Sequence, residues 1–357
     1  MKWLQLLILF YFVTPVIAKD CNDFLNLNLE KIIVTEATLI KDDGDLPSFC
    51  RVRGVINPDI GFEARLPDKN WNGKFFQAGC GGFCGLIEPD RNSHSNAINH
   101  ALRKGYAAIT TNGGHQGKHL GDAEWAKGNP AARKVYAFTV IKFTYDAGHH
   151  LIKRFYNQKP DYSYFSGCSN GGRLAAKAAQ IYPNLFDGII SGCPILNLTE
   201  NAGIFGPWLL QSNLNDKKNE ILTIKFNAKL VWLEKYVLDK CDGLDGSNFF
   251  ESNGKLLMWA GLADPLVLPQ QTVDYYKNVR KLFGNNTDKF FKLFLVPGMG
   301  HCWEMESRIP DQMSMLTVIE NWVEKEISPD FIPIKSLNMK SEVKDGFLRP
   351  FPLMAEY

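Results

Sequence analysis

The chain has 357 residues and a formal net charge of +2 at neutral pH, and 45% of its residues are hydrophobic. This length can bury a complete α/β core, and so small a net charge gives no reason to expect a nucleic acid or a membrane surface as partner. After the first residues, no segment approaches the run of about 20 apolar residues that a membrane-spanning helix needs.

The first 18 residues have the pattern of an export signal. Met1 and Lys2 are followed by a mainly apolar stretch over residues 3–13, and Val16–Ala18 ends the segment on a small residue. We expect cleavage after Ala18, a secreted or periplasmic protein, and a single domain over residues 19–357. Export would place the eight cysteines in an oxidising compartment, which permits four disulfides.

Two strand-like runs in the first half each end in a glycine-rich loop. Residues 74–77 precede the loop Gly79–Gly85, and Ala107–Thr111 precedes Gly113, Gly114 and His115. We expect His115 to have a structural role. Cys80 and Cys84 form one C-x₃-C pair with no matching second pair, so we expect oxidised or buried thiols there instead of a metal site.

A serine lies on a predicted sharp turn between a strand and a helix. The chain reads Gly-Cys-Ser-Asn-Gly over residues 167–171, after an aromatic strand-like run at 161–166 and before an Ala-rich helical run at 173–182. Glycine at 167, 171 and 172 lets the backbone turn tightly and lets strand and helix approach each other. This arrangement predicts a nucleophile elbow that exposes Ser169 at the carboxyl end of a parallel sheet.

Two later strand-like runs end in an acid and in a histidine. Lys255–Ala260 leads into Asp264 and Pro265, and Phe290–Val296 leads through a glycine-rich loop to His301. A serine needs a histidine to accept its proton, and a carboxylate that holds the histidine in the required tautomer. The order Ser169, Asp264, His301 is that of an α/β-hydrolase triad, so we expect this fold with a mostly parallel central sheet.

These motifs resemble the tannase and feruloyl esterase family, whose signature is Cys-Ser, Asp and His-Cys. Similar segments occur through most of the chain: Leu46–Val52, Leu66–Pro67, Trp71–Phe75, Gly79–Phe83, Gly167–Arg173, Pro183–Ile190, Ala263–Leu266, Gly298–Cys302 and Arg349–Pro350. The resemblance implies Ser169 as nucleophile, Asp264 as orienting carboxylate and His301 as general base and acid.

The resemblance also implies two disulfides and an oxyanion site. The pairs are Cys168 with Cys302, which would join the nucleophile loop to the histidine loop, and Cys21 with Cys50; the partners of Cys80, Cys84, Cys193 and Cys241 stay open. The oxyanion donors would be the backbone N–H of Asn170 and an N–H of the loop Gly79–Gly85. We favour Gly82 in that loop, followed by Gly81.

The family usually inserts a lid of roughly two hundred residues before the acid strand, and here residues 196–254 fill that place. Asp242 and Asp245 resemble the start of the family's calcium loop, but Phe249 stands at the next acidic position. Calcium takes six to eight oxygen ligands, and two adjacent acids supply too few. We therefore expect that the much shortened lid holds no calcium and that the protein has no other cofactor.

Together these features predict a serine carboxylic-ester hydrolase that works through an acyl-enzyme. The family implies aromatic acyl groups such as gallate, ferulate or a terephthalic ester. A shortened lid leaves open an acyltransferase or a broad small-ester hydrolase. A non-catalytic binding protein on a hydrolase scaffold is the alternative from another class, and the intact Ser169, Asp264 and His301 argue against it.

Overall fold

The computed structural model describes residues 20–27, 29–41, 44–57, 59–91, 93–198, 201, 247–302, 312–337 and 343–353. The expected signal segment and most of the expected lid, including Cys241, Asp242 and Asp245, lie outside these residues. Within them, no helix combines the length and apolar character needed to cross a bilayer.

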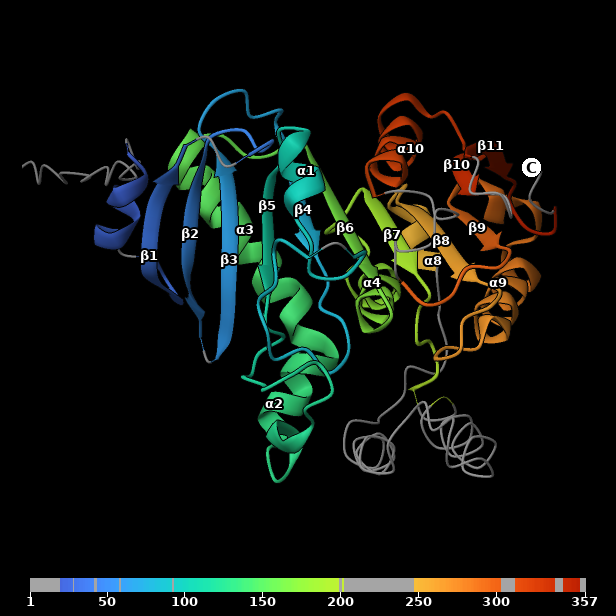
Figure 1. Ribbon diagram of the computed structural model, residues 1–357, viewed down its shortest axis with the longest axis horizontal. Helices are drawn as coiled ribbons and strands as arrows, with labels where there is room; N and C mark the ends of the chain where they lie inside the picture. Colours follow the sequence, from blue (N-terminus) through green and yellow to red (C-terminus); the bar gives the residue numbers. More distant parts are fainter. Residues whose placement is uncertain are drawn as a thin grey trace, which may run out of the picture.

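A nine-stranded sheet with the order β1-β2-β3-β5-β4-β6-β7-β8-β9 runs through the molecule (Figure 1). Its first four strands pair antiparallel, and the remaining pairs, from β5 to β9, are parallel. The bounds are β1 Ile32–Ile40, β2 Phe49–Ile56, β3 Ile60–Pro67, β4 Lys74–Ala78, β5 Ala107–Thr111, β6 Tyr162–Cys168, β7 Gly188–Gly192, β8 Lys255–Gly261 and β9 Phe291–Val296. The sheet is mostly parallel, as predicted.

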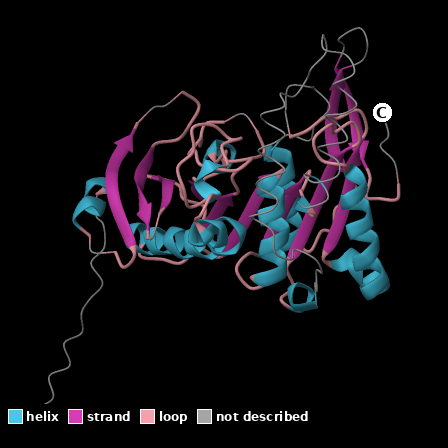
Figure 2. Ribbon diagram, turned by 90° about the horizontal axis from the view of Figure 1, so that it is seen from below, coloured by secondary structure: helices cyan, strands magenta, loops and turns pink. Residues whose placement is uncertain are grey.

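Helices pack on both faces of this sheet, and Figure 2 shows them gathered against the strands in a second view. Their bounds are η1 Cys21–Asn26, α1 Asn99–Arg103, η2 Glu124–Ala126, α2 Pro130–Lys134, η3 Val135–Thr139, α3 Val140–Tyr156, α4 Asn170–Ile181, α8 Ser247–Glu251, α9 Pro269–Phe283, η5 Gly284–Lys289 and α10 Gln312–Lys325. A small antiparallel hairpin, β10 Ile332–Leu337 with β11 Val343–Leu348, follows α10.

The core has two main parts, one on each face of the sheet. One contains buried residues of α3, α4 and α9, and the other contains buried residues of α1 and α10. Strands β7 and β8 are buried along their whole length. Parallel strands covered on both faces need such continuous runs of buried residues, which is why the segment that forms β8 was recognisable in the sequence as a strand.

The predicted elements around Ser169 are present with shifted ends. The strand expected over 161–166 is β6, Tyr162–Cys168, and the helix expected over 173–182 is α4, Asn170–Ile181. Helix α4 therefore begins three residues earlier than predicted. Gly171 and Gly172 have low helix propensity, but they are needed in the first turn because other backbone segments pass close to it.

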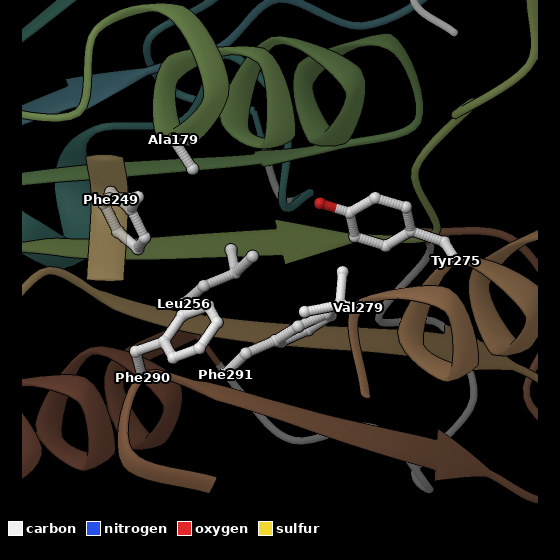
Figure 3. Close-up of a pocket in the computed structure, with 7 residues that line it drawn as sticks. All are labelled: Ala179, Phe249, Leu256, Tyr275, Val279, Phe290 and Phe291. Atoms are coloured by element: carbon white, nitrogen blue, oxygen red, sulfur yellow. The ribbon is translucent and has the colours of Figure 1, made fainter. Parts of the chain in front are cut away.

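Phe249 belongs to the core. It lies on α8 and lines a small apolar cavity between α4, α9 and strands β8 and β9 (Figure 3). The seven lining residues are Ala179, Phe249, Leu256, Tyr275, Val279, Phe290 and Phe291. None of them is charged, and Phe249 packs among these side chains in the core.

Candidate active site

Ser169 occupies a strained turn at the carboxyl end of β6. Its φ is 61° and its ψ is −121°, in the half of φ/ψ space that L-residues rarely enter. The Ser169 N–H donates to the carbonyl of Gly192 at 2.9 Å, and the Ser169 carbonyl accepts from Arg173 at 2.9 Å. The backbone is thus held on both sides of a half-buried serine side chain, as a nucleophile elbow requires.

Close backbone contacts explain the glycines of this turn. A Cβ on Gly167 would lie 2.5 Å from the carbonyl oxygen of Gly171, and one on Gly172 would lie 2.3 Å from that of Gly192. A Cβ on Gly79 would lie 2.9 Å from the Cα of Gly171. Strand β6, helix α4 and the loop after β4 can therefore meet at these distances only without side chains.

Asp264 and His301 form a buried pair. His301 Nδ1 lies 2.6 Å from Asp264 Oδ2, and the two side chains are 7% and 1% exposed. The other oxygen, Oδ1, accepts from the backbone N–H groups of Leu266 and Val267 at 2.8 and 2.9 Å. Because an ionised carboxylate only accepts hydrogen bonds, Nδ1 carries the proton of the neutral imidazole, and Nε2 is its basic nitrogen.

A disulfide joins the serine loop to the histidine loop. Cys168 and Cys302 are bonded across a sequence separation of 134, and their Cα atoms are 5.9 Å apart. Each is the chain neighbour of a predicted triad residue. The bridge therefore fixes the distance between two loops that no local interaction would hold together.

The side chain of Asn170 ties the elbow to the glycine-rich loop after β4. Its Nδ2 donates to the carbonyl of Cys80 at 3.0 Å, and its Oδ1 accepts from Tyr136 Oη and Arg173 Nε, both at 2.8 Å. Tyr136 Oη also lies 3.2 Å from the carbonyl oxygen of Gly82. This network sets the position of the Asn170 backbone relative to the predicted oxyanion loop.

The two glycines of that loop differ in their backbone N–H groups. The Gly81 N–H donates to Asn96 Oδ1 at 2.9 Å and is therefore already engaged. Among the described residues, no hydrogen bond uses the Gly82 N–H or the Asn170 N–H. Asn170 is the first residue of α4, where N–H groups have no partner within the helix and favour negative charge.

A second disulfide and His115 support the same loop. Cys80 and Cys84, whose partners the sequence left open, are bonded to each other. His115 Nε2 is 2.7 Å from the carbonyl oxygen of Phe83, and its ring stacks on Trp125 with centroids 3.6 Å apart. Burial lowers the pKa of His115 to about 4, so the ring is neutral at pH 7 and supports the loop, in keeping with a structural role.

The remaining cysteines have different environments. Cys21 and Cys50 form the disulfide that the resemblance implied, between η1 and β2 and away from Ser169. Cys193 is a buried free thiol at the end of β7. Sequence reasoning assigned no role to Cys193, Tyr136 or Arg173. Of these three residues, only Arg173 could have been recognised from the sequence as a supporting residue, because it follows Ser169 by four positions and lies on the predicted helix.

Comparison with known proteins identifies the family. The family described as tannase and feruloyl esterase matches residues 47–248 and 245–357. An uncharacterised esterase of Xanthomonas campestris is 36% identical over 239 residues, which are 63% of this chain and 39% of that protein. A mono(2-hydroxyethyl) terephthalate hydrolase of Piscinibacter sakaiensis is 34% identical over 224 residues, 56% of this chain and 37% of that protein. The chain thus matches about two fifths of the length of these curated relatives.

Solved structures show the same fold. Feruloyl esterase B from Aspergillus oryzae superposes with a TM-score of 0.74 at 19% identity, over 94% of this chain and 95% of that one. Tannin acyl hydrolase from Aspergillus niger gives 0.65 at 15% identity, over 91% and 90% of the two chains. The α/β-hydrolase fold and the resemblance inferred from the motifs are both confirmed, and the chain belongs to the tannase and feruloyl esterase family.

Proposed function

We propose that this protein is a serine carboxylic-ester hydrolase that uses Ser169, Asp264 and His301. The observation that carries the proposal is the buried His301–Asp264 pair, joined through the Cys168–Cys302 bridge to a serine in the strained conformation of an elbow. Asp264 orients His301, the disulfide holds the histidine loop against the serine loop, and backbone hydrogen bonds hold the turn at Ser169. Acyl transfer requires such preorganised geometry.

In the proposed reaction, Ser169 Oγ attacks the ester carbonyl carbon while His301 Nε2 accepts the hydroxyl proton. The N–H groups of Asn170 and Gly82 stabilise the oxyanion of the tetrahedral intermediate. His301 then gives its proton to the departing alkoxide, which leaves as the alcohol and leaves an acyl-Ser169. Water, deprotonated by His301, attacks this ester, and collapse of the second intermediate releases the acid and restores the serine.

We propose aromatic acyl groups as substrates, because the names of related proteins include feruloyl esterase and mono(2-hydroxyethyl) terephthalate hydrolase. We also propose that the protein works outside the cytoplasm. The three disulfides among the described residues support this, since disulfides persist in oxidising compartments.

Labelling with a fluorophosphonate, combined with an ester panel, tests the proposal. The panel contains methyl gallate, methyl ferulate, mono(2-hydroxyethyl) terephthalate and p-nitrophenyl acetate. We expect labelling of Ser169, hydrolysis of at least one aromatic ester, and a loss of about 10⁴- to 10⁶-fold in kcat for Ser169→Ala. An unlabelled protein that hydrolyses no ester would instead be a binding protein on this scaffold.

Ser163→Ala is the matched control. Ser163 lies on the same strand, and its Oγ is 3.1 Å from His149 Nε2, so it is also paired with a histidine. It is buried in regular strand, however, with 4% exposure, and burial lowers the pKa of His149 to about 4. Ser163→Ala should keep labelling and most of the rate, and equal loss in both variants would refute Ser169 as nucleophile.

A further inference from the structure

Three of the ten described non-glycine residues with positive φ lie at the proposed triad or directly beside it. Ser169, Cys193 and Cys302 have φ values of 61°, 35° and 40°, although none of them is glycine. Ser169 follows β6, Cys193 follows β7, and Cys302 follows His301. Strained conformations persist where the surrounding structure holds them, and they cluster at functional sites. Ser169 and Cys302 already have roles, but Cys193 has none.

Cys193 lies between the strands that lead to the nucleophile and to the acid. Strand β7 has β6 on one side and β8 on the other, and the Cys193 N–H donates to the Trp259 carbonyl of β8 at 2.8 Å. The thiol is free and 1% exposed. Its sulfur, a carboxylate oxygen of Asp264 and a ring nitrogen of His301 all lie within 4.8 Å of one another.

Asp264 has room for one more donor. Within the part of the chain that the structure describes, its oxygens accept hydrogen bonds from Leu266, Val267 and His301, whereas a carboxylate offers about four lone-pair positions. Burial raises the pKa of the Cys193 thiol, and the charge of the neighbouring Asp264 carboxylate raises it further. Backbone N–H groups of Gly261 and Cys302 act in the opposite direction, but burial and the Asp264 charge outweigh them. The thiol therefore stays protonated at neutral pH and acts as a donor.

We propose that Cys193 is a positioning residue whose S–H donates to the Asp264 carboxylate and holds it in the orientation that His301 needs. The inference rests on the proposed function, because it assigns Cys193 to the same triad. By sharing part of the negative charge, the thiol also moderates the pull of Asp264 on the imidazolium form of His301.

Two other uses of the thiol fit the structure less well. The sulfurs of Cys168, Cys193 and Cys302 also lie within 4.8 Å of one another, which places the thiol beside the disulfide. Exchange with that disulfide needs a thiolate, and so does a metal site at this position. Both the burial and the adjacent Asp264 charge oppose formation of the thiolate.

Among the described residues, Asp264 and His301 are the titratable groups that form one cluster with the Cys193 sulfur. Cys193 follows β7, Asp264 follows β8 and His301 follows β9, while His94 packs against Trp259 of β8 with ring centroids 5.0 Å apart. The disulfide cysteines do not titrate. A change at Cys193 should therefore be read out through Asp264 and His301.

The test compares Cys193→Ala and Cys193→Ser by the pH dependence of kcat/KM on the best ester of the panel. Without the donor, Asp264 stabilises imidazolium more strongly, so the acidic midpoint should rise by about 0.5 pH unit. Looser orientation of Asp264 should lower kcat by about three- to tenfold, with KM unchanged. Cys193→Ser restores a donor and should recover both values.

Ile190→Val is the matched control, since it removes one buried methylene from β7, the strand that leads to Cys193, and leaves the triad residues unchanged. It should keep the parent midpoint. A parent midpoint in Cys193→Ala, or equal shifts in Ala and Ser variants, would overturn the proposal. Active-site titration with fluorophosphonate distinguishes failure of the proposed function from failure of the proposed role of Cys193. An unlabelled parent contradicts the proposed function. A labelled parent whose pH profile is unchanged in Cys193→Ala contradicts only the role of Cys193.

Infrared spectroscopy supplies a measurement that does not depend on folding of Cys193→Ala. With Cys241 replaced by Ser in each protein, the S–H stretching band reports Cys193. A hydrogen-bonded thiol absorbs at lower frequency, so Asp264→Asn, a weaker acceptor, should move the band to higher frequency. A band at the frequency of a free thiol in the parent would contradict the proposed hydrogen bond.

Discussion

Removing the Cys168–Cys302 bridge should damage catalysis more than its effect on stability explains. The double substitution Cys168→Ala with Cys302→Ala breaks the bond and leaves no free thiol at either position. The disulfide is the covalent link between the Ser169 loop and the His301 loop. Without it, their separation depends on packing and on the hydrogen bonds of the sheet that carries both loops.

The stability effect can be calculated from the loop length. For a sequence separation of 134, the chain-entropy model gives about 5 kcal/mol. The Cys21–Cys50 bridge closes a separation of only 29, for which the same model gives about 3.6 kcal/mol. The stabilisation expected from the two bridges therefore differs by only about 1.4 kcal/mol. The Cys21–Cys50 bridge lies away from Ser169.

The catalytic effect has a different origin. Serine and histidine must meet within about 3 Å, and a displacement near 1 Å costs on the order of a hundredfold in rate. We expect a loss of at least this size in kcat for the Cys168/Cys302 double variant. The Cys21/Cys50 double variant should keep kcat within about threefold of the parent, because its bridge positions no triad residue.

Kinetics on folded protein, with the folded fraction measured by circular dichroism at the assay temperature, separate the two effects. Denaturant unfolding gives the stability of each variant, and active-site titration gives the concentration of competent enzyme. Equal kcat losses in the two double variants would refute the positional role of the bridge. So would alkylation of Cys168 or Cys302 in the folded, unreduced parent.

Two further predictions concern the groups that support the site and the sheet. Tyr136→Phe removes the hydroxyl bound to Asn170 Oδ1, and we expect about 1 kcal/mol lower stability in denaturant unfolding and about tenfold lower kcat; an unchanged kcat would show that this bond does not set the oxyanion site. Burial opposes ionisation of Glu320 on α10. Hydrogen bonds from Lys104 and Tyr106 and the charges of Lys104 and Lys74 outweigh this effect, so the pKa of the Glu320 carboxyl lies below its ordinary value of 4.5. The ionised carboxylate therefore stabilises the fold above pH 4.5, and this stabilisation is lost as the pH falls through the lower pKa of the folded state. The melting temperature of the parent should decrease more steeply from pH 5 to pH 3 than that of Glu320→Gln. Parallel curves would contradict this role of Glu320.

The candidate triad was predictable because each member follows a segment that local patterns reveal. Ser169 lies in a short motif, and Asp264 and His301 each follow an apolar run that became a strand of the parallel sheet. Parallel strands put their carboxyl ends at one edge, so the order of the motifs already implied that the three side chains are neighbours. The strands and helices expected around them formed, with shifts of a few residues at their ends.

The supporting residues were not predictable in this way. Tyr136 and Asn170 are 34 positions apart, and Asn170 and Cys80 are 90 apart, yet they share one hydrogen-bond network. No periodicity or motif relates positions so distant, because the contacts form only after the sheet has brought the segments together. The same holds for the engaged N–H of Gly81, which distinguishes it from Gly82 through a bond to Asn96.

The sequence by itself determined the fold class, the family and the candidate catalytic residues, since burial runs, glycine turns and short motifs are local properties. The tertiary structure decided that Cys80 pairs with Cys84, which loop amides have no hydrogen bond among the described residues, and that Cys193 lies against Asp264 and His301. The physical reason is that the four cysteines left open by the resemblance allow several pairings, and only the position of each sulfur in the folded chain selects among them.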